Sequence, residues 1–429
     1  MLTTDCTIRM NLQRTVFVVA ACTCASMIMA TLIPQPFNCA GTGNIYVTNY
    51  GSASVSVIDA VTGNVSFITV GRNPVGVAIS PDGTSVYVTN TGDGTVSVID
   101  TTTGIVSDTI TVGSHPIGVA VSPNGTFVYV ANYGDIPGSV SVITAATGAV
   151  SKPITVGYYP NVMAISRDGT FLYLTNYAGD DPGSVSVIDT TTGTVSNTIT
   201  VGTQPNGVAI SPNGTFVYVA NSDDGTVSVI DTATKAVSNT TTVGSVPTGV
   251  AISPDGSFAY VTNTGSNSVS VITTATGILN ATITVGPIGL GADGVAISPD
   301  GSFVYVANSG SNTVSVITTA TGILNATITV GTHPQGVAVC PGPTPPTPTT
   351  VPPPTPPPSP APAPAPAPDT GDSGTPDVYD SSNFTTMTWI LVGLLIGVPL
   401  VIVGVWYKMS HRYTLVPNYN TEDMEGSYL

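Results

Sequence analysis

Acidic side chains gather in the loops of a repeated segment. Their residue type and spacing could support the binding of a ligand. In four copies of the segment, aspartates follow a Tyr-Val-x-Asn-like tetrapeptide within a few residues: Asp93, Asp135, Asp180, Asp181, Asp223 and Asp224. Grouped carboxylates suit a cationic ligand or Ca²⁺, a hard cation that prefers oxygen ligands. The alternative is that they are solvated turn residues, because aspartate before glycine favours tight turns.

A second loop of the same segment, VGxxPxGVA, varies most on either side of its proline. His115 and His333 precede the proline, whereas Asn161 and Asn206 follow it. The sixth copy lacks this proline and places Asp293 at the position after it. If the copies bring these loops together, we expect these five residues to bind a small molecule. A polar surface residue is the alternative for His115.

Hydrolytic catalysis finds little support in the residue types. A lactone-hydrolysing site needs a base or metal-activated water and a group that stabilises the oxyanion. Glutamate first occurs at Glu422, and the segment that repeats contains no G-x-S-x-G, HExxH, P-loop or CxxC pattern. We therefore assign no catalytic residue and no metal site, and we keep a hydrolase as the alternative function.

Charge excludes one class of partner. The 429 residues include eight Lys and Arg against 24 Asp and Glu, with a net charge of −16. A nucleic-acid partner requires a basic surface that displaces counterions from the phosphates. We therefore expect no nucleic-acid binding.

The elements that must position these loops are short strands in a repeat. Successive marker tyrosines lie 41 to 45 residues apart, the period of four-stranded propeller blades. In the second copy we expect strands at 76–80, 85–90, 95–100 and 106–112, because β-branched residues alternate there between turn sequences. The seven markers are Tyr46, Tyr87, Tyr129, Tyr173, Tyr218, Tyr260 and Tyr305.

The ends of the repeated region predict how it closes. It starts on a second strand at 44–49 and finishes on a first strand at 336–339. The two ends of the region therefore contribute strands to the same blade. This closes the ring of blades and leaves no unpaired terminal blade. The expected fold is all-β, a seven-bladed β-propeller of four-stranded antiparallel blades over residues 41–340. Its second-to-third-strand loops and its interblade loops share one face, which we call the top face.

The repeats, with IYVTN at Tyr46 and VYVAN at Tyr129, resemble those of the YVTN-family β-propeller proteins. The resemblance implies the seven-bladed fold. For function it implies only a superfamily that includes lactonases as well as surface and binding proteins. WD40 repeats do not match, because no tryptophan occurs before Trp389.

Two cysteines flank the propeller. Cys39 and Cys340 occupy the place that Ser80 has in the second copy, at the turn between first and second strands. We expect a disulfide between them in an oxidising compartment. The alternatives are two unpaired cysteines, or loss of Cys39 when a leader is removed.

The chain ends indicate membrane attachment. An apolar run at 15–30 after Arg9 and Arg14 predicts a signal peptide within 1–40, cleaved after Ala25, Ala30 or Ala40 or retained as an anchor. Residues 341–387 form a proline-rich and then acidic stalk, expected to be extended and disordered. An uncharged run within 388–407 predicts one transmembrane helix.

Lys408 and Arg412 after the span place the tail, 408–429, in the cytoplasm. In that tail, Tyr413 and Val416 form a Tyr-x-x-hydrophobic pattern typical of sorting signals, a pattern that also occurs by chance.

Asparagine sequons complete the surface, and none falls in an expected top-face loop. The sequons are Asn64, Asn124, Asn213, Asn239, Asn280, Asn325 and Asn383. Duplication of N-G-T turns with the repeat is the alternative reason for two of them.

These observations predict a single-pass type I cell-surface protein that carries a propeller outside the membrane. Its top face would bind an extracellular protein or glycan as an adhesion, receptor-like or surface-coat module. A membrane-tethered lactonase-like hydrolase is the alternative. Apart from the possible Ca²⁺ in the acidic loops, we expect no cofactor.

Overall fold

The computed structural model describes residues 43–177, 182–286 and 292–341. Several predictions fall outside these ranges: the signal peptide, Cys39, Asp180, Asp181, the stalk, the span at 388–407, Asn383, Tyr413 and Val416. Within the described ranges, no helix has the length and apolar character to cross a membrane.

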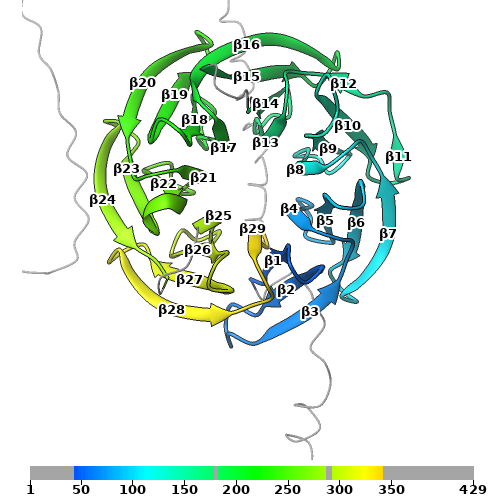
Figure 1. The fold of residues 1–429 in the computed structure, drawn as a ribbon, viewed down its shortest axis with the longest axis horizontal. Helices are drawn as coiled ribbons and strands as arrows, with labels where there is room; N and C mark the ends of the chain where they lie inside the picture. Colours follow the sequence, from blue (N-terminus) through cyan, green and yellow to red (C-terminus); the bar gives the residue numbers. More distant parts are fainter. Residues whose placement is uncertain (1–42, 178–181, 287–291, 342–429) are drawn as a thin grey trace, which may run out of the picture. The chain divides into compact units, whose positions relative to one another are not determined.

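Seven antiparallel sheets form the blades of a ring, as Figure 1 shows. Blade A contains β29 (Pro334–Val339), β1 (Ile45–Asn49), β2 (Ser54–Ile58) and β3 (Val65–Thr69). Blade B contains β4 (Pro74–Ile79), β5 (Ser85–Asn90), β6 (Thr95–Asp100) and β7 (Ile105–Thr111). Blade C contains β8 (Pro116–Val121), β9 (Phe127–Asn132), β10 (Ser139–Thr144), β11 (Ala149–Val150) and β12 (Ile154–Thr155).

The other four blades have four strands each. Blade D contains β13 (Pro160–Ile165), β14 (Phe171–Asn176), β15 (Pro182–Asp189) and β16 (Thr194–Thr203). Blade E contains β17 (Pro205–Ile210), β18 (Phe216–Asn221), β19 (Thr226–Asp231) and β20 (Ala236–Thr242). Blade F contains β21 (Pro247–Ile252), β22 (Phe258–Asn263), β23 (Ser268–Thr273) and β24 (Ile278–Thr284). Blade G contains β25 (Ala292–Ile297), β26 (Phe303–Asn308), β27 (Thr313–Thr318) and β28 (Ile323–Thr329).

Blade A closes the ring as the sequence predicts. Its strand order is β29-β1-β2-β3, so the last strand of the propeller supplies the innermost position of the first blade. Ile45 pairs with Val339 in an antiparallel register, and the Cys340 amide donates to the Asn44 carbonyl at 2.9 Å. Because both ends are built into one sheet, neither terminal strand is left as an open edge.

Cys340 is fully buried at this closure and takes part in a disulfide. Its partner lies outside the described residues, as do all the other cysteines of the chain. The pairing with Cys39 therefore stays a prediction.

The asparagine that ends each tetrapeptide motif ties three parts of its blade together. Asn221 is fully buried, and its Nδ2 donates to the hydroxyls of Thr226 (3.0 Å) and Ser228 (2.9 Å) on β19. Its Oδ1 accepts from the Gly202 amide of the interblade loop at 3.2 Å. Equivalent amide-to-hydroxyl bonds recur in every blade. A buried amide needs these partners, which explains why the asparagine recurs in every blade.

The motif threonine joins neighbouring blades. Thr89 Oγ1 accepts from the Gly76 amide of its own blade at 2.8 Å and donates to the Ile117 carbonyl of blade C at 2.7 Å. A Cβ added at Gly76 would overlap that same Ile117 carbonyl oxygen. Glycine here lets the innermost strands approach closely around the channel.

The hydrophobic core lies between the blades. Tyr46, Val57 and Ile68 of blade A pack with Val86 and Ile99 of blade B in one buried cluster. Similar clusters link the other neighbouring blades. Each sheet therefore buries both faces, and its stability depends on its neighbours.

Blade C departs from the expected four strands. Its outer strand is broken into β11 and β12, which both pair with β10. Pro153 lies in the break and has no amide hydrogen to donate to the ladder, so pairing is interrupted there.

Turns between first and second strands form the bottom face and use aspartate or asparagine interchangeably. Asp82 accepts from the Ser80 hydroxyl at 2.6 Å and the Thr84 amide at 3.0 Å, and Asn124 makes the corresponding bonds in blade C. The Ser80 hydroxyl, followed by the Thr84 amide, lowers the pKa of Asp82. Asp168, Asp255 and Asp300 have lowered pKa values for the same reason.

These turns predict a pH dependence. A lowered carboxyl pKa contributes stability above the ordinary value of about 4, and this contribution is lost as the pH falls through the lowered pKa. Changing Asp82, Asp168, Asp255 and Asp300 together to Asn should leave the thermal midpoint at pH 7 within a few degrees. Between pH 5 and pH 2 the variant should lose a few degrees less than the unchanged chain.

Thermal unfolding followed by circular dichroism across this pH range tests the prediction. The protein should come from a host without N-glycosylation, because each substitution creates an N-G-S or N-G-T sequon. Parallel pH profiles for the two proteins would show that these turns do not contribute.

Candidate functional site

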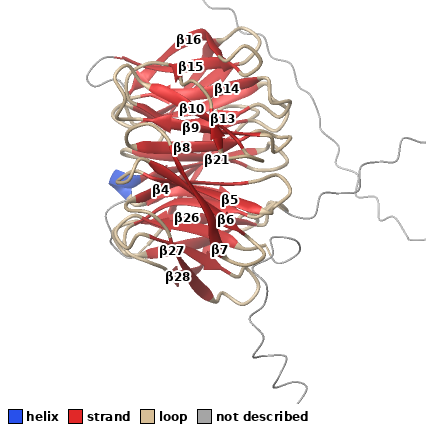
Figure 2. Ribbon diagram, turned by 90° about the vertical axis from the view of Figure 1, so that its right-hand side faces the viewer, coloured by secondary structure: helices blue, strands red, loops and turns tan. Residues whose placement is uncertain are grey.

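The two faces of the ring carry different loops (Figure 2). The second-to-third-strand loops and the interblade loops lie together on the top face, as backbone hydrogen bonds between them show in several blades. The short helix η1 (Thr264–Ser266), within the β22–β23 loop, marks this face in Figure 2.

The interblade loops hold the residue before proline in an unusual backbone conformation. His115, Tyr159 and Val246 have φ values of 49°, 51° and 52°, a region that non-glycine residues rarely adopt. The carbonyl of each accepts an amide from the adjacent second-to-third-strand loop, as Tyr133 donates to His115 at 3.1 Å. This bond stabilises the strained turn, which is the kind of backbone that clusters at binding sites.

Three of the top-face aspartates anchor these loops. Asp93 accepts from the Arg72 amide and guanidinium, and the Arg72 backbone bond is the main reason that the pKa of Asp93 is lowered. Asp135 accepts from the Ser114 amide at 2.9 Å, and Asp224 accepts from the Thr203 amide at 2.7 Å. These contacts give the aspartates a structural task, and their ligand-binding role stays a prediction. Asp223 is exposed on the same face.

A cavity of about 580 Å³ occupies the central channel and opens among these loops. The residues after the interblade prolines line it, as the sequence predicts for Asn161 and Asn206. Its described lining contains no Asp, Glu, Lys or Arg. The cavity is therefore within the size range of small-molecule sites, and His115 is the one imidazole of its described lining.

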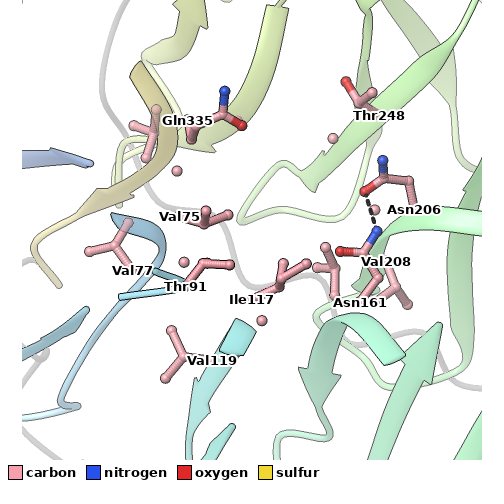
Figure 3. Close-up of a pocket in the computed structure, with 18 of the residues that line it drawn as sticks. Val75, Val77, Thr91, Ile117, Val119, Asn161, Asn206, Val208, Thr248 and Gln335 are labelled. Carbon is pink, nitrogen blue, oxygen red and sulfur yellow. Dashed lines mark hydrogen bonds between the residues drawn. The ribbon is translucent and has the colours of Figure 1, made fainter. Parts of the chain in front are cut away.

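The lining side chains change character from blade to blade, as Figure 3 shows. Val75 and Ile117 of blades B and C are apolar, with Val77 and Val119 near them. Asn161 and Asn206 follow in blades D and E, beside Val208, and Asn161 Nδ2 donates to Asn206 Oδ1 at 3.1 Å. Thr248 of blade F and Gln335 of blade A also line the cavity.

Tyrosines at the rim are functional candidates that the sequence analysis missed. Tyr50 and Tyr133 line the cavity, and the Tyr133 ring lies 5.2 Å from that of Tyr159. The hydroxyl of Tyr177 donates to Gln204 Oε1 at 2.6 Å, and burial raises the pKa of Tyr133 and Tyr177. The signal for Tyr50, Tyr133 and Tyr177 was their common position, directly after the motif asparagine.

The two histidines have different settings. His115 lines the cavity, with its imidazole above Gly134. His333 is outside the described lining and packs its imidazole above Gly51. Asp293 belongs to β25, and its side chain is not described. Among described residues, no group of three or more His, Cys, Asp or Glu is arranged to hold a metal ion.

The sequons of the propeller lie away from the cavity. Asn124 and Asn213 occupy bottom-face turns, and Asn64 directly precedes the outer strand β3. Asn239, Asn280 and Asn325 lie on the outer strands β20, β24 and β28. All six are exposed, so sugars attached to them would leave the top face open.

A family model described as YNCE-like beta-propeller matches residues 10–340, which is most of the chain. The chain belongs to the YNCE-like β-propeller family. This agrees with the tetrapeptide repeats and the seven sheets, and it confirms the resemblance to YVTN-type propellers.

Solved structures share the propeller fold. Hydrazine synthase from Kuenenia stuttgartiensis is 27% identical, with a TM-score of 0.61, over 67% of this chain and 96% of that chain. A functionally unknown protein from Desulfotomaculum acetoxidans DSM 771 is 20% identical, with a TM-score of 0.61, over 70% and 99%. Dihydro-heme d1 dehydrogenase NirN in complex with DHE is 17% identical, with a TM-score of 0.55, over 72% and 78%. The last two likenesses show the fold alone.

A PE-PGRS family protein, PE_PGRS18 of Mycobacterium tuberculosis, is 65% identical over 40 residues. This match covers 9% of each chain, so the YNCE-like chain spans only about a tenth of that relative. The match is short enough to fall within a single repeat.

Proposed function

We propose that this chain is a single-pass cell-surface protein that displays its propeller on a proline-rich stalk and binds a ligand or partner through the top face. One observation carries the proposal. The framework residues repeat from blade to blade, whereas the residues at the mouth of the channel change from Val75 and Ile117 to Asn161 and Asn206. Variation on a repeated scaffold is where such proteins differ in binding.

Two further features support display and recognition. The six sequons of the propeller lie on the bottom face and the outer rim, which leaves the mouth accessible. The apolar run within 388–407 and the basic residues after it support a span with the propeller outside.

The recognition test probes an array of neutral saccharides, charged saccharides, peptides and small organic molecules with the detergent-solubilised full-length chain. A Val75→Arg variant should lose the captured signal, because the long cationic side chain would occupy the cavity. The matched control is Thr102→Arg in an exposed bottom-face turn, which should keep the signal. Equal signals for both variants would contradict top-face recognition, as would the absence of any captured probe.

Protease added to intact cells tests display. It should remove the propeller while an epitope after residue 429 stays protected, whereas an intact propeller or a cleaved epitope would contradict the topology. His115 in the cavity is the observation that favours the alternative hydrolase. Turnover of a lactone that is lost in His115→Ala would favour that alternative.

A further inference from the structure

We infer that the top-face cavity takes an uncharged saccharide of one or two sugar rings. This inference rests on the proposed function and names the ligand class of the same site. It combines the amide pair, the tyrosine rim and the described lining without Asp, Glu, Lys or Arg, to which all seven blades contribute.

The amide pair presents a donor and an acceptor next to each other. Asn161 is only 8% exposed, and its one side-chain hydrogen bond within the described structure is the one that it donates to Asn206. This leaves Asn161 Oδ1 as an acceptor and Asn206 Nδ2 as a donor, in a pair that lines the cavity. Neither atom is fully buried, so a ligand that displaces water from them must offer hydrogen-bonding groups of its own. A hydroxyl group both donates and accepts and therefore satisfies either atom.

The tyrosine rim adds flat apolar surfaces with polar edges. Tyr50 and Tyr133 line the cavity, and Tyr159 packs beside Tyr133. Such rings combine apolar contact area with a hydroxyl that can form a hydrogen bond. A sugar ring has the matching character, because its C–H faces are apolar and its edge carries hydroxyls.

The described part of the lining favours an uncharged ligand. It contains no Asp, Glu, Lys or Arg side chain to compensate a buried charge, which is expensive to leave unpaired, and its one imidazole is that of His115. The side chain of Asp293, at the equivalent position of blade G, is not described. Val75 and Ile117, on the two blades that precede those of the amides, offer an apolar surface to the ligand. A ligand that is neutral, hydroxyl-bearing on one edge and rich in C–H groups on its faces satisfies all these surfaces.

Saturation-transfer NMR on the full-length chain tests the ligand class directly. The neutral probes are glucose, N-acetylglucosamine, cellobiose and chitobiose; the charged probes are glucuronic acid and glucosamine. We expect transfer to the C–H protons of at least one neutral probe and little to the charged ones. Asn206→Ala should weaken binding about tenfold, the effect of losing about 1.4 kcal/mol of hydrogen bonding.

Asn280→Ala on the outer strand β24 is the matched control and should bind like the unchanged chain. Val75→Arg gives a second variant that blocks the cavity without removing an amide, and thermal midpoints verify that each variant is folded. Saccharide binding that is unchanged in both Asn206→Ala and Val75→Arg would overturn the inference. So would equal binding of neutral and charged sugars.

Failure of the inference can be separated from failure of the proposed function. If no saccharide binds but an array probe of another class is captured and is lost in Val75→Arg, the saccharide assignment falls and top-face recognition stands. If no probe of any class depends on Val75, both fall.

Discussion

Replacing Asn221 with alanine is expected to lower the free energy of unfolding by about 3 kcal/mol, through the loss of two donated hydrogen bonds and one accepted bond at a buried site. Asn221 is fully buried, and its amide connects β19 to the interblade loop through Thr226, Ser228 and Gly202. The variant would leave the Gly202 amide and the two hydroxyls without this partner. Urea or thermal unfolding of the full chain measures the loss.

Asn280→Ala provides the control for this experiment. Asn280 is exposed on β24, so its replacement should change stability by no more than about 0.5 kcal/mol. Both proteins should be made without N-glycosylation, because Asn280 belongs to a sequon. Similar unfolding curves for the two variants would show that the motif asparagine does not hold the blade together.

Breaking the disulfide at Cys340 is expected to lower stability by about 2 to 5 kcal/mol. Cys340 is fully buried directly after β29, the strand that closes blade A. If the partner is Cys39, the bond joins the two ends of the propeller and restricts the unfolded chain through a very long loop. Thermal unfolding with and without dithiothreitol measures the effect on the full chain.

Cys340→Ser separates the disulfide from general effects of the reductant. The variant should unfold like the reduced unchanged chain and should not respond to dithiothreitol. Peptide mapping under non-reducing conditions should recover Cys340 linked to a peptide that contains Cys39. A link to Cys6, Cys22 or Cys24 would contradict the predicted pairing, and stability independent of reductant would contradict its contribution.

The fold was predictable because one pattern recurs at a constant period. Alternating β-branched residues and turn sequences define four strands in each copy, and the starting and finishing strands predict the shared blade. Strand bounds differ by a residue or two, as in β4, which starts at Pro74 instead of Gly76. Blade C was less predictable, because Pro153 interrupts an outer strand that the other copies keep continuous.

The candidate site was predictable only in part. The position after the interblade proline was correctly expected to reach the channel, which places Asn161, Asn206 and Gln335 in its lining. The two histidines occupy equivalent positions in the repeat, yet only His115 belongs to the described lining. The anchoring of loops by Asp93 and Asp135 could also not be predicted from the sequence, because an aspartate in a turn can either bind a ligand or hold the loop.

By itself, the sequence determines the seven blades, their four-strand pattern, the shared closing blade and the position after the interblade proline that faces the channel. These features follow from local periodicity, since strand alternation and turn residues act over a few neighbours. Only the tertiary structure decides that Asn161 meets Asn206, 45 residues away, or that Thr48 accepts from the Gly336 amide across 288 residues. Those contacts depend on how closely the innermost strands approach when the ring closes, and this distance is set by packing between blades.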